Sequence, residues 1–500
     1  MLLTPALPSL ELSGESVVAV ASTTPTATAT PGADELDAAL AAVRRDLVQG
    51  LEELVREAQK RKLYLQRDHL YSAMVELDPD HRAARRALSY RRDRDGNWER
   101  GRYREPADRG QEGALEEFSA LRASRLGSIR KHLLEIVSRP AVSPARREHE
   151  LRSWVALDPE DEELRAALGE RRGPQGRWLL ADSVQALARR EELRRIVRDA
   201  RESVPEPVTW RMPASLVDQA LPWTVSLRTR DARIAGTVEQ SEIRADLDAL
   251  FVLWKILDVA VKPAPIPRDG PRRIITDWHE RFTAYVLGST RHVPLLLDGF
   301  PELTPTEREL FQQLITGWLR VGYVLGVWGQ GELARRDSLA RQVAGRWINE
   351  SYGVSPRHGW VWEGLGLYLA WHAVGTRLTF FVRPGSYVQD NQGPNLSKEL
   401  RAEDADWYGL LADLLATDRP PKLAFLLGKD VNGMDERELL LAHGLAAWLV
   451  EARADVAPEI FGRVGLGENS ARVLEEVLGI RLPQLERHLA RWADEVRDAR

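Results

Sequence analysis

The sequence predicts an α+β fold, in which an all-helical repeat arm precedes a domain with a small twisted sheet and a mostly helical C-terminal half. Two observations support this prediction. Residues 34–205 are rich in Arg, Glu, Leu and Ala and contain an internal repeat, whereas residues 206–500 have fewer charge runs, more tryptophan and several strand-like segments. Residues 1–33 precede both domains, and we expect this segment to be disordered or processed.

The amino-terminal segment does not match an export signal. Met1–Leu10 is apolar, but it lacks a basic start and contains two prolines. Residues 22–33 consist mainly of Thr, Ala and Pro, a composition that favours an extended linker over a packed element. We therefore expect folding to begin near Asp34.

The helical arm contains a duplicated unit. Identical residues recur at a constant offset of 80 positions without a gap, which indicates duplication of a structural element. They include the Leu-Asp-Pro triplets at 77–79 and 157–159, the pairs Arg85 and Arg165, Gly96 and Gly176, and Trp98 and Trp178, and the dipeptides Ala-Leu at 87–88 and 167–168 and Arg-Arg at 91–92 and 171–172.

Each copy predicts a short helical unit. We expect one helix to end before Leu77, Asp78 to cap the next, Gly96 to turn the chain and Trp98 to fold back onto the pair. This arrangement resembles the helical hairpins of tetratricopeptide arrays in style, although the spacing differs. The arm is either a scaffold whose concave face binds a peptide or partner domain, or a packing module that serves as a spacer.

The second part of the chain alternates strand-like and helical segments, which is typical of an α+β domain. The predicted strands are 223–229, 272–276 and 322–328, and the predicted helices are 241–259, 307–318, 339–352 and 436–452.

Several segments of this part, in their order, resemble the peptidase-MA-like branch of the gluzincin metalloproteases. They are the strand-helix segment 272–285, the helix 339–352, the motif Trp-Glu-Gly-x3-Tyr at 362–368, and the closing helices around 442–451 and 473–492. The resemblance covers about 290 residues. It implies a zincin-like domain whose first site helix carries His-Glu-x-x-His and whose second supplies the third zinc ligand.

The zinc ligands and the general base implied by this resemblance are largely absent. Arg341 stands at the first His, Gln342 at the catalytic Glu and Gly345 at the second His, while only Glu363 keeps its expected place. Arginine stays protonated, glycine has no side chain, and glutamine cannot accept a proton from a metal-bound water. We therefore expect no metal or other cofactor and no hydrolysis by the familial mechanism.

The substitutions predict a replacement for the metal. If Glu363 still points into the former zinc position, its buried charge needs a partner, and Arg341 is placed to supply it. We therefore predict an ion pair between Arg341 and Glu363. The alternative is a solvated Arg341 beside a Glu363 that caps its own helix.

The former protease cleft is a candidate binding surface, because a groove can bind an extended chain as an added strand without any metal. Its candidate lining residues are aromatic, although such residues on helices more often form core. They are Trp328, Trp347, Trp360, Trp362, Tyr368 and Trp371. The histidines near this region are His358, His372 and His443, and none has a partner at metal-ligand spacing, so each is expected to be a capping, core-edge or surface residue.

Composition excludes several classes of function. The 70 Lys and Arg nearly balance the 75 Asp and Glu, which argues against nucleic acid as a partner. There are no cysteines, which excludes disulfides and thiolate chemistry. No run of about 18 uncharged apolar residues is present, so no transmembrane segment is expected.

These observations favour a catalytically inactive metalloprotease-like protein, a pseudopeptidase, that binds peptide, protein or cell-envelope partners through the former cleft and the arm. One alternative is an active zinc-dependent peptidase, or another hydrolase, with a non-standard ligand set. A second is a structural scaffold without a specific ligand. The resemblance favours an exported or envelope protein, whereas the lack of a clear signal leaves a cytoplasmic protein open.

Overall fold

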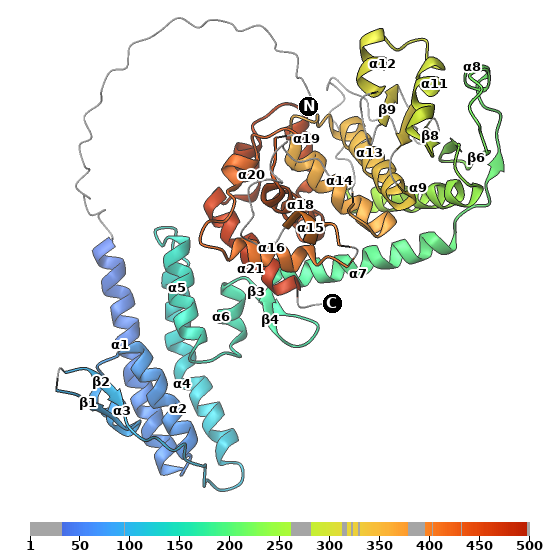
Figure 1. Cartoon of the computed structure of the whole chain (residues 1–500). Coiled ribbons are helices and arrows are strands. Elements are labelled where there is room, and N and C mark those ends of the chain that lie inside the picture. The colour runs from blue at the N-terminus through green and yellow to red at the C-terminus, as the bar shows by residue number, and fades with distance from the viewer. Residues whose placement is uncertain are drawn as a thin grey trace, which may run out of the picture. The chain divides into compact units, whose positions relative to one another are not determined.

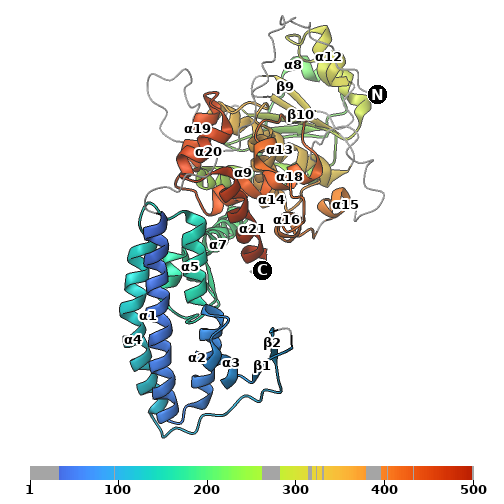
Figure 2. The same cartoon turned by 90° about the vertical axis from the view of Figure 1, so that its left-hand side faces the viewer.

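A computed structural model shows a mostly helical chain with small sheets, which confirms the α+β prediction. It describes residues 33–94, 96–261, 282–312, 318–321, 324–328, 331–378, 396–402, 404–431 and 433–497. The chain forms two compact units, residues 1–168 and 169–500 (Figures 1 and 2). The first described helix begins at Ala33.

The first unit is built on long helices, of which α1 and α4 run side by side (Figure 2). Apolar residues in α1 recur every three or four positions and are buried; they stand at positions 40, 43, 47, 51, 54 and 58. Ser143 caps α5 by accepting a hydrogen bond from the Arg146 amide. The helices are α1 (Ala33–Lys60), α2 (Tyr64–Leu77), α3 (Arg82–Ala87), α4 (Ala114–Val137), α5 (Pro144–Val155) and α6 (Glu162–Ala167).

Each copy of the duplicated unit contains two helices in contact, α2 with α3 and α5 with α6, and a β-hairpin that the sequence did not predict follows them. In the first copy α3 leads into β1 (Tyr90–Arg92) and β2 (Trp98–Arg100), and in the second α6 leads into β3 (Glu170–Arg172) and β4 (Trp178–Leu180). The duplicated glycines adopt φ values of +86° and +75° in the hairpin turns, where glycine avoids the strain of a side chain. The chain therefore turns at the glycine as predicted, but between strands.

Other duplicated residues make the same contacts in both copies. Arg85 Nε donates to the Pro79 carbonyl over 2.9 Å, and Arg165 Nε donates to the Pro159 carbonyl over 3.0 Å. The tryptophan that opens the second strand lies under the arginine that ends the first, at 4.9 and 4.5 Å in the two copies. Asp78 does not cap the second helix, because it follows α2 and the cap of α3 is His81.

The boundary between the two units follows Leu168, earlier than the position 205 expected from composition. The reason is α7 (Ala181–Glu202), which is rich in charge but packs against α9, α18 and α21 of the second unit. Its buried face includes Arg190 and Leu193. The boundary expected from composition therefore assigned α7 to the first unit, whereas it packs in the second.

The second unit contains a mixed sheet with the strand order β5-β6-β7-β8-β10-β9 among the described residues. Strand β8 pairs in parallel with both β7 and β10, and the other pairs of this sheet are antiparallel. The strands are β5 (Val208–Thr209), β6 (Val225–Arg228), β7 (Arg233–Gly236), β8 (Thr283–Leu287), β9 (Trp318–Val321) and β10 (Val324–Trp328).

The predicted strands at 223–229 and 322–328 correspond to β6 and β10, whereas 272–276 lies outside the described residues. Tyr285 lies in the middle of β8, so the end of the segment 272–285 is a strand and not a helix. All five residues of β8 are buried, because both faces of the strand are covered. Alternate residues face opposite sides: Ala284 packs in one core cluster and Tyr285 in another.

The helix α14 lies at the centre of the second unit, between α13 and α18 (Figure 1). It is buried on nearly every side, which explains its almost continuous apolar sequence. Gly364 allows the close approach of α18, since a Cβ atom there would lie 2.3 Å from the Ala442 carbonyl oxygen. The predicted helix at 339–352 is the C-terminal part of α13, which begins at Glu332.

The remaining helices cover the sheet and complete the C-terminal half. The predicted helix at 307–318 corresponds in part to α12, which is described as far as Gln312; residues 313–317 lie outside the described residues, and Trp318 begins the edge strand β9. The helices are α8 (Ala214–Val217), α9 (Gln240–Ala260), η1 (Thr290–His292), α11 (Val293–Asp298), α12 (Pro305–Gln312), α13 (Glu332–Tyr352), α14 (Gly359–Val374), α15 (Leu396–Leu400), α16 (Trp407–Leu415), α17 (Leu423–Leu426), α18 (Glu436–Glu451), α19 (Ala457–Gly465), α20 (Ser470–Leu478) and α21 (Leu482–Arg497).

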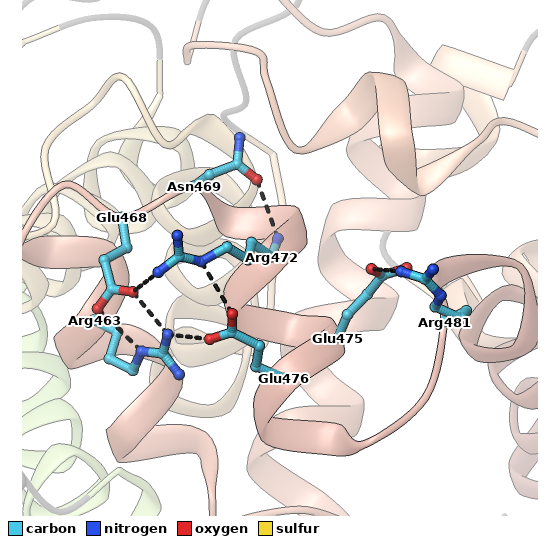
Figure 3. A network of polar contacts seen from close by, with 7 residues as sticks. All are labelled: Arg463, Glu468, Asn469, Arg472, Glu475, Glu476 and Arg481. Carbon is cyan, nitrogen blue, oxygen red and sulfur yellow. Dashed lines mark hydrogen bonds and ion pairs between the residues drawn. The ribbon is translucent and has the colours of Figure 1, made fainter.

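An ion-pair network joins α19 to α20 at the surface (Figure 3). Arg463 contacts Glu468 over 2.7 Å and Glu476 over 2.5 Å, while Asn469 caps α20 by accepting a hydrogen bond from the amide of Arg472. A hydrogen bond from the Arg463 side chain holds the pKa of Glu468 below its usual value. Within the described ranges, no helix is both long and apolar enough to span a membrane.

Candidate functional site

Two helices bring together residues that the resemblance aligns with a zinc site. Arg341 lies on α13 and Glu363 on α14, and these helices pack along each other. Arg341 Nη2 donates a hydrogen bond to Glu363 Oε1 over 3.1 Å, and the side chains are 5% and 0% exposed. The predicted ion pair is therefore confirmed. The alternative, a solvated Arg341 beside a helix-capping Glu363, is wrong.

The neighbouring positions are filled by packing. Gly345 lies against the ring of Trp362, and a Cβ atom on Gly345 would approach that ring to 2.8 Å. A histidine side chain at this position would require Trp362 to move. Gln342 follows Arg341 in the chain and is buried, with a neutral amide where the resemblance implies a carboxylate.

Both charges of this ion pair are carried by side chains, Arg341 and Glu363. Opposite charges offset part of the desolvation cost that either side chain would carry alone in a dry interior. Over the residues that the structure describes, no group of three or more His, Asp or Glu side chains is arranged to hold a metal ion. The arrangement can anchor α13 to α14.

A second buried polar cluster centres on Glu451 at the end of α18. Arg190 Nη2 donates to Glu451 Oε2 over 2.7 Å, and the hydroxyls of Tyr408 and Tyr368 donate to Glu451 Oε1 over 2.8 and 3.2 Å. One carboxylate thus connects α7, α14, α16 and α18. Burial raises the pKa of both tyrosines, so they remain hydrogen-bond donors across the physiological range.

Two histidines are buried next to this cluster. The ring of His372 lies 4.7 Å from that of Tyr368, and the ring of His443 lies 4.7 Å from that of Trp407. Burial, with a smaller effect from Arg377, lowers the pKa of His372 to about 3 and that of His443 well below its usual value. Both imidazoles are therefore neutral core side chains. The expectation of core-edge or surface positions is wrong for these two residues.

A pocket of about 370 Å³ opens on one side of the cluster, within the second unit. Arg377 lies in its wall, with its guanidinium 4.4 Å from the ring of Trp371 and 4.8 Å from that of Trp407. The pocket is lined by Arg190, Arg194, Trp371, Arg377, Asp404, Ala405, Asp406, Trp407, Tyr408, Val496 and Arg497.

The residues predicted to line the former cleft separate into two groups. Trp328, Trp347, Trp360 and Tyr368 belong to the core, with exposures of 1%, 7%, 0% and 0%. Trp328 moreover packs in the core on the opposite face of the sheet from α13 and α14. These four side chains therefore contribute to packing, as aromatic residues on helices and strands commonly do. Trp362 and Trp371 are half-buried, and Trp371 lines the pocket beside Arg377.

The helical arm has a pocket of its own, of about 330 Å³, within the first unit. It lies among α1, α2 and α4 and the turn after α5. Its lining combines apolar side chains with polar ones: Leu51, Gln66, His69, Leu70, Ser72, Ala73, Glu76, Phe118, Arg122, Leu126, Ala156, Leu157, Asp158 and Pro159.

Sequence reasoning did not identify Arg190, Arg377, Tyr408 or Glu451 as a cluster. Arg190 is one of many arginines in a charged helix, and its partner Glu451 lies 261 positions away. The adjacent Trp407 and Tyr408 at the start of α16 were the available signal, since two aromatics followed by an apolar helix indicate a buried end. Comparisons with protein-family models, with curated proteins and with solved structures found no match.

Proposed function

We propose that the chain is a non-catalytic, metalloprotease-like protein that acts by binding a peptide, protein or cell-envelope partner. The buried ion pair between Arg341 and Glu363 carries this proposal, because it puts a permanent positive charge where the gluzincin pattern needs a neutral zinc ligand. Gly345 packed against Trp362 supports it, since the second histidine ligand has no room there. Binding is the activity that such a site retains.

The pocket of the arm supports a binding role for the first unit. It has a mixed apolar and polar lining, which is typical of surfaces that hold a peptide side chain. The helical-repeat architecture supports the same role, because stacked helical pairs present such surfaces.

Two measurements on the purified full-length chain test the proposal. The zinc content after incubation with zinc and desalting should be well below one ion per chain, and a library of quenched fluorescent peptides should remain uncut. Stoichiometric zinc, removed by a chelator together with a peptidase activity, would overturn the non-catalytic assignment.

The binding role is tested on an array of immobilised peptides with two matched variants. Ser72→Arg places a large charged side chain at the exposed edge of the arm pocket, whereas Ser119→Arg places it on exposed α4 outside the pocket. Peptides bound by the unmodified chain should be lost with the first variant and kept with the second. An unmodified chain that binds nothing on the array would favour the scaffold alternative.

A further inference from the structure

Arg377 is a buried cation that the proposed function does not use. Gly375 ends α14 with φ +87°, and the chain then turns so that Arg377 packs back between Trp371 and Trp407. The residue is 7% exposed. Both ring distances are in the range of cation–π contacts, so the two indoles restrict the position of the guanidinium.

The other buried arginines of the second unit each have a carboxylate. Arg190 pairs with Glu451, Arg335 with Glu242 and Arg341 with Glu363. Arg377 has no ion pair or hydrogen bond with any residue that the structure describes, and its Nε is buried without a hydrogen-bond partner among them. Stacking on aromatic rings recovers only part of the cost of burying such a charge.

The electrostatics of the site agree with this geometry. Burial lowers the pKa of Arg377 to about 10, although Tyr408, Asp337 and other nearby acidic groups act in the opposite direction. The guanidinium therefore lacks the strong local stabilisation that a directly bound anion provides.

The pocket beside Arg377 has the size and walls for a small organic molecule. Its volume is about 370 Å³, and Trp371, Trp407 and Tyr408 supply aromatic surface. Its other arginines have carboxylate partners: Arg190 contacts Glu451, Arg497 contacts Asp413, and Arg194 contacts Glu191 over 3.7 Å.

Two carboxylates limit the charge of a suitable ligand. Asp404 and Asp406 also line the pocket, so a multiply charged phosphate would meet repulsion there. A single carboxylate matches the planar fork of one guanidinium. The aromatic walls favour an apolar or aromatic body on that carboxylate.

We propose that this pocket binds an organic carboxylate, with the carboxylate on Arg377 and an apolar or aromatic body against Trp371, Trp407 and Tyr408. The carboxylate belongs either to a small acid or to the C-terminus of a peptide. The proposal does not depend on the former zinc position, because carboxylate binding and zinc content are separate measurements.

Calorimetric titration of the full-length chain tests the chemistry without any mutation. The probes are N-acetyl-L-phenylalanine, its primary amide, N-acetyl-Ala-Ala-Phe with a free carboxylate, and inorganic phosphate. The acid should bind at least tenfold more tightly than the amide, and phosphate should bind more weakly than the acid. Tighter binding of the tripeptide would identify a peptide C-terminus as the source, and binding of the small acid alone would identify a metabolite. Equal binding of acid and amide, or binding of neither acid, overturns the proposal.

Variants then test the residue. Arg377→Gln removes the charge, and Arg377→Lys keeps the charge but loses the planar fork. The control is Arg472→Gln, whose arginine is 65% exposed and lies outside the pocket. We expect more than a tenfold loss of acid binding for Arg377→Gln, an intermediate loss for Arg377→Lys and no change for the control, with circular dichroism confirming the fold. Unchanged binding by Arg377→Gln, or an equal loss in the control, contradicts the assignment. If Arg377→Gln does not fold, the comparison of acid with amide still decides.

Discussion

The ion pair between Arg341 and Glu363 gives a prediction about stability that the geometry makes quantitative. Both side chains are almost fully buried, at 5% and 0% exposure, so water does little to screen a charge left without its partner. Arg341→Met leaves the carboxylate of Glu363 in a dry interior, and Glu363→Gln leaves the guanidinium there. Each single change should lower the free energy of unfolding by roughly 3–5 kcal/mol, the range found for breaking a buried pair.

The double variant, Arg341→Met with Glu363→Gln, should cost much less than the sum of the two single variants, because no buried charge remains. The assay is urea unfolding of the full-length chain, followed by circular dichroism, with the four proteins forming a double-mutant cycle. Lys422→Met is the control, because its pair with Glu486 is half exposed and should shift the midpoint far less. Additive single costs would refute the reasoning that the two charges stabilise each other.

Two further predictions concern packing and pH. A side chain at Gly345 has to displace the ring of Trp362, so Gly345→Ala should lower the free energy of unfolding by about 1–3 kcal/mol. The control is Gly462→Ala on α19, whose added methyl group meets open space and should not lower it. Equal urea midpoints for the two variants would contradict the packing of Gly345 against Trp362. The buried His372 and His443 have lowered pKa values, about 3 for His372, so they bind protons less readily when folded than when unfolded. Their contribution is complete above pH 6.5 and is lost as the pH falls from 6.5 towards 3, by at most about 1.4 kcal/mol per pH unit for each histidine. His443→Phe should flatten the dependence of the urea midpoint on pH between 6.5 and 4, and an unchanged slope would show that this histidine does not titrate as expected.

The sequence predicted those features that depend on local pattern. The strands β6 and β10 and the helices α9, α13 and α18 follow from apolar periodicity and from glycine and proline breaks, whereas α14 was implied by the family resemblance. The ion pair between Arg341 and Glu363 could be predicted because the resemblance to the gluzincin pattern implies that these two positions face each other.

Features that depend on long-range contacts could not be predicted in the same way. The side of the sheet that Trp328 faces depends on strand register, which a run of apolar residues does not fix. The pairing of Arg190 with Glu451 joins helices that are far apart in the chain, and charged residues at helix surfaces look alike before packing selects one of them. The hairpins of the duplicated unit were missed because each strand has only three residues.

The duplicated unit also affects how the chain can be divided for experiments. The boundary between the compact units passes between α6 and β3, inside the second copy, while the whole first copy lies in the first unit. A cut at this boundary would separate the second hairpin from its helix, and a cut near 205 would remove α7, with Arg190, from its partners. Fragments that overlap across residues 157–202 would preserve both the repeat and the buried carboxylate cluster.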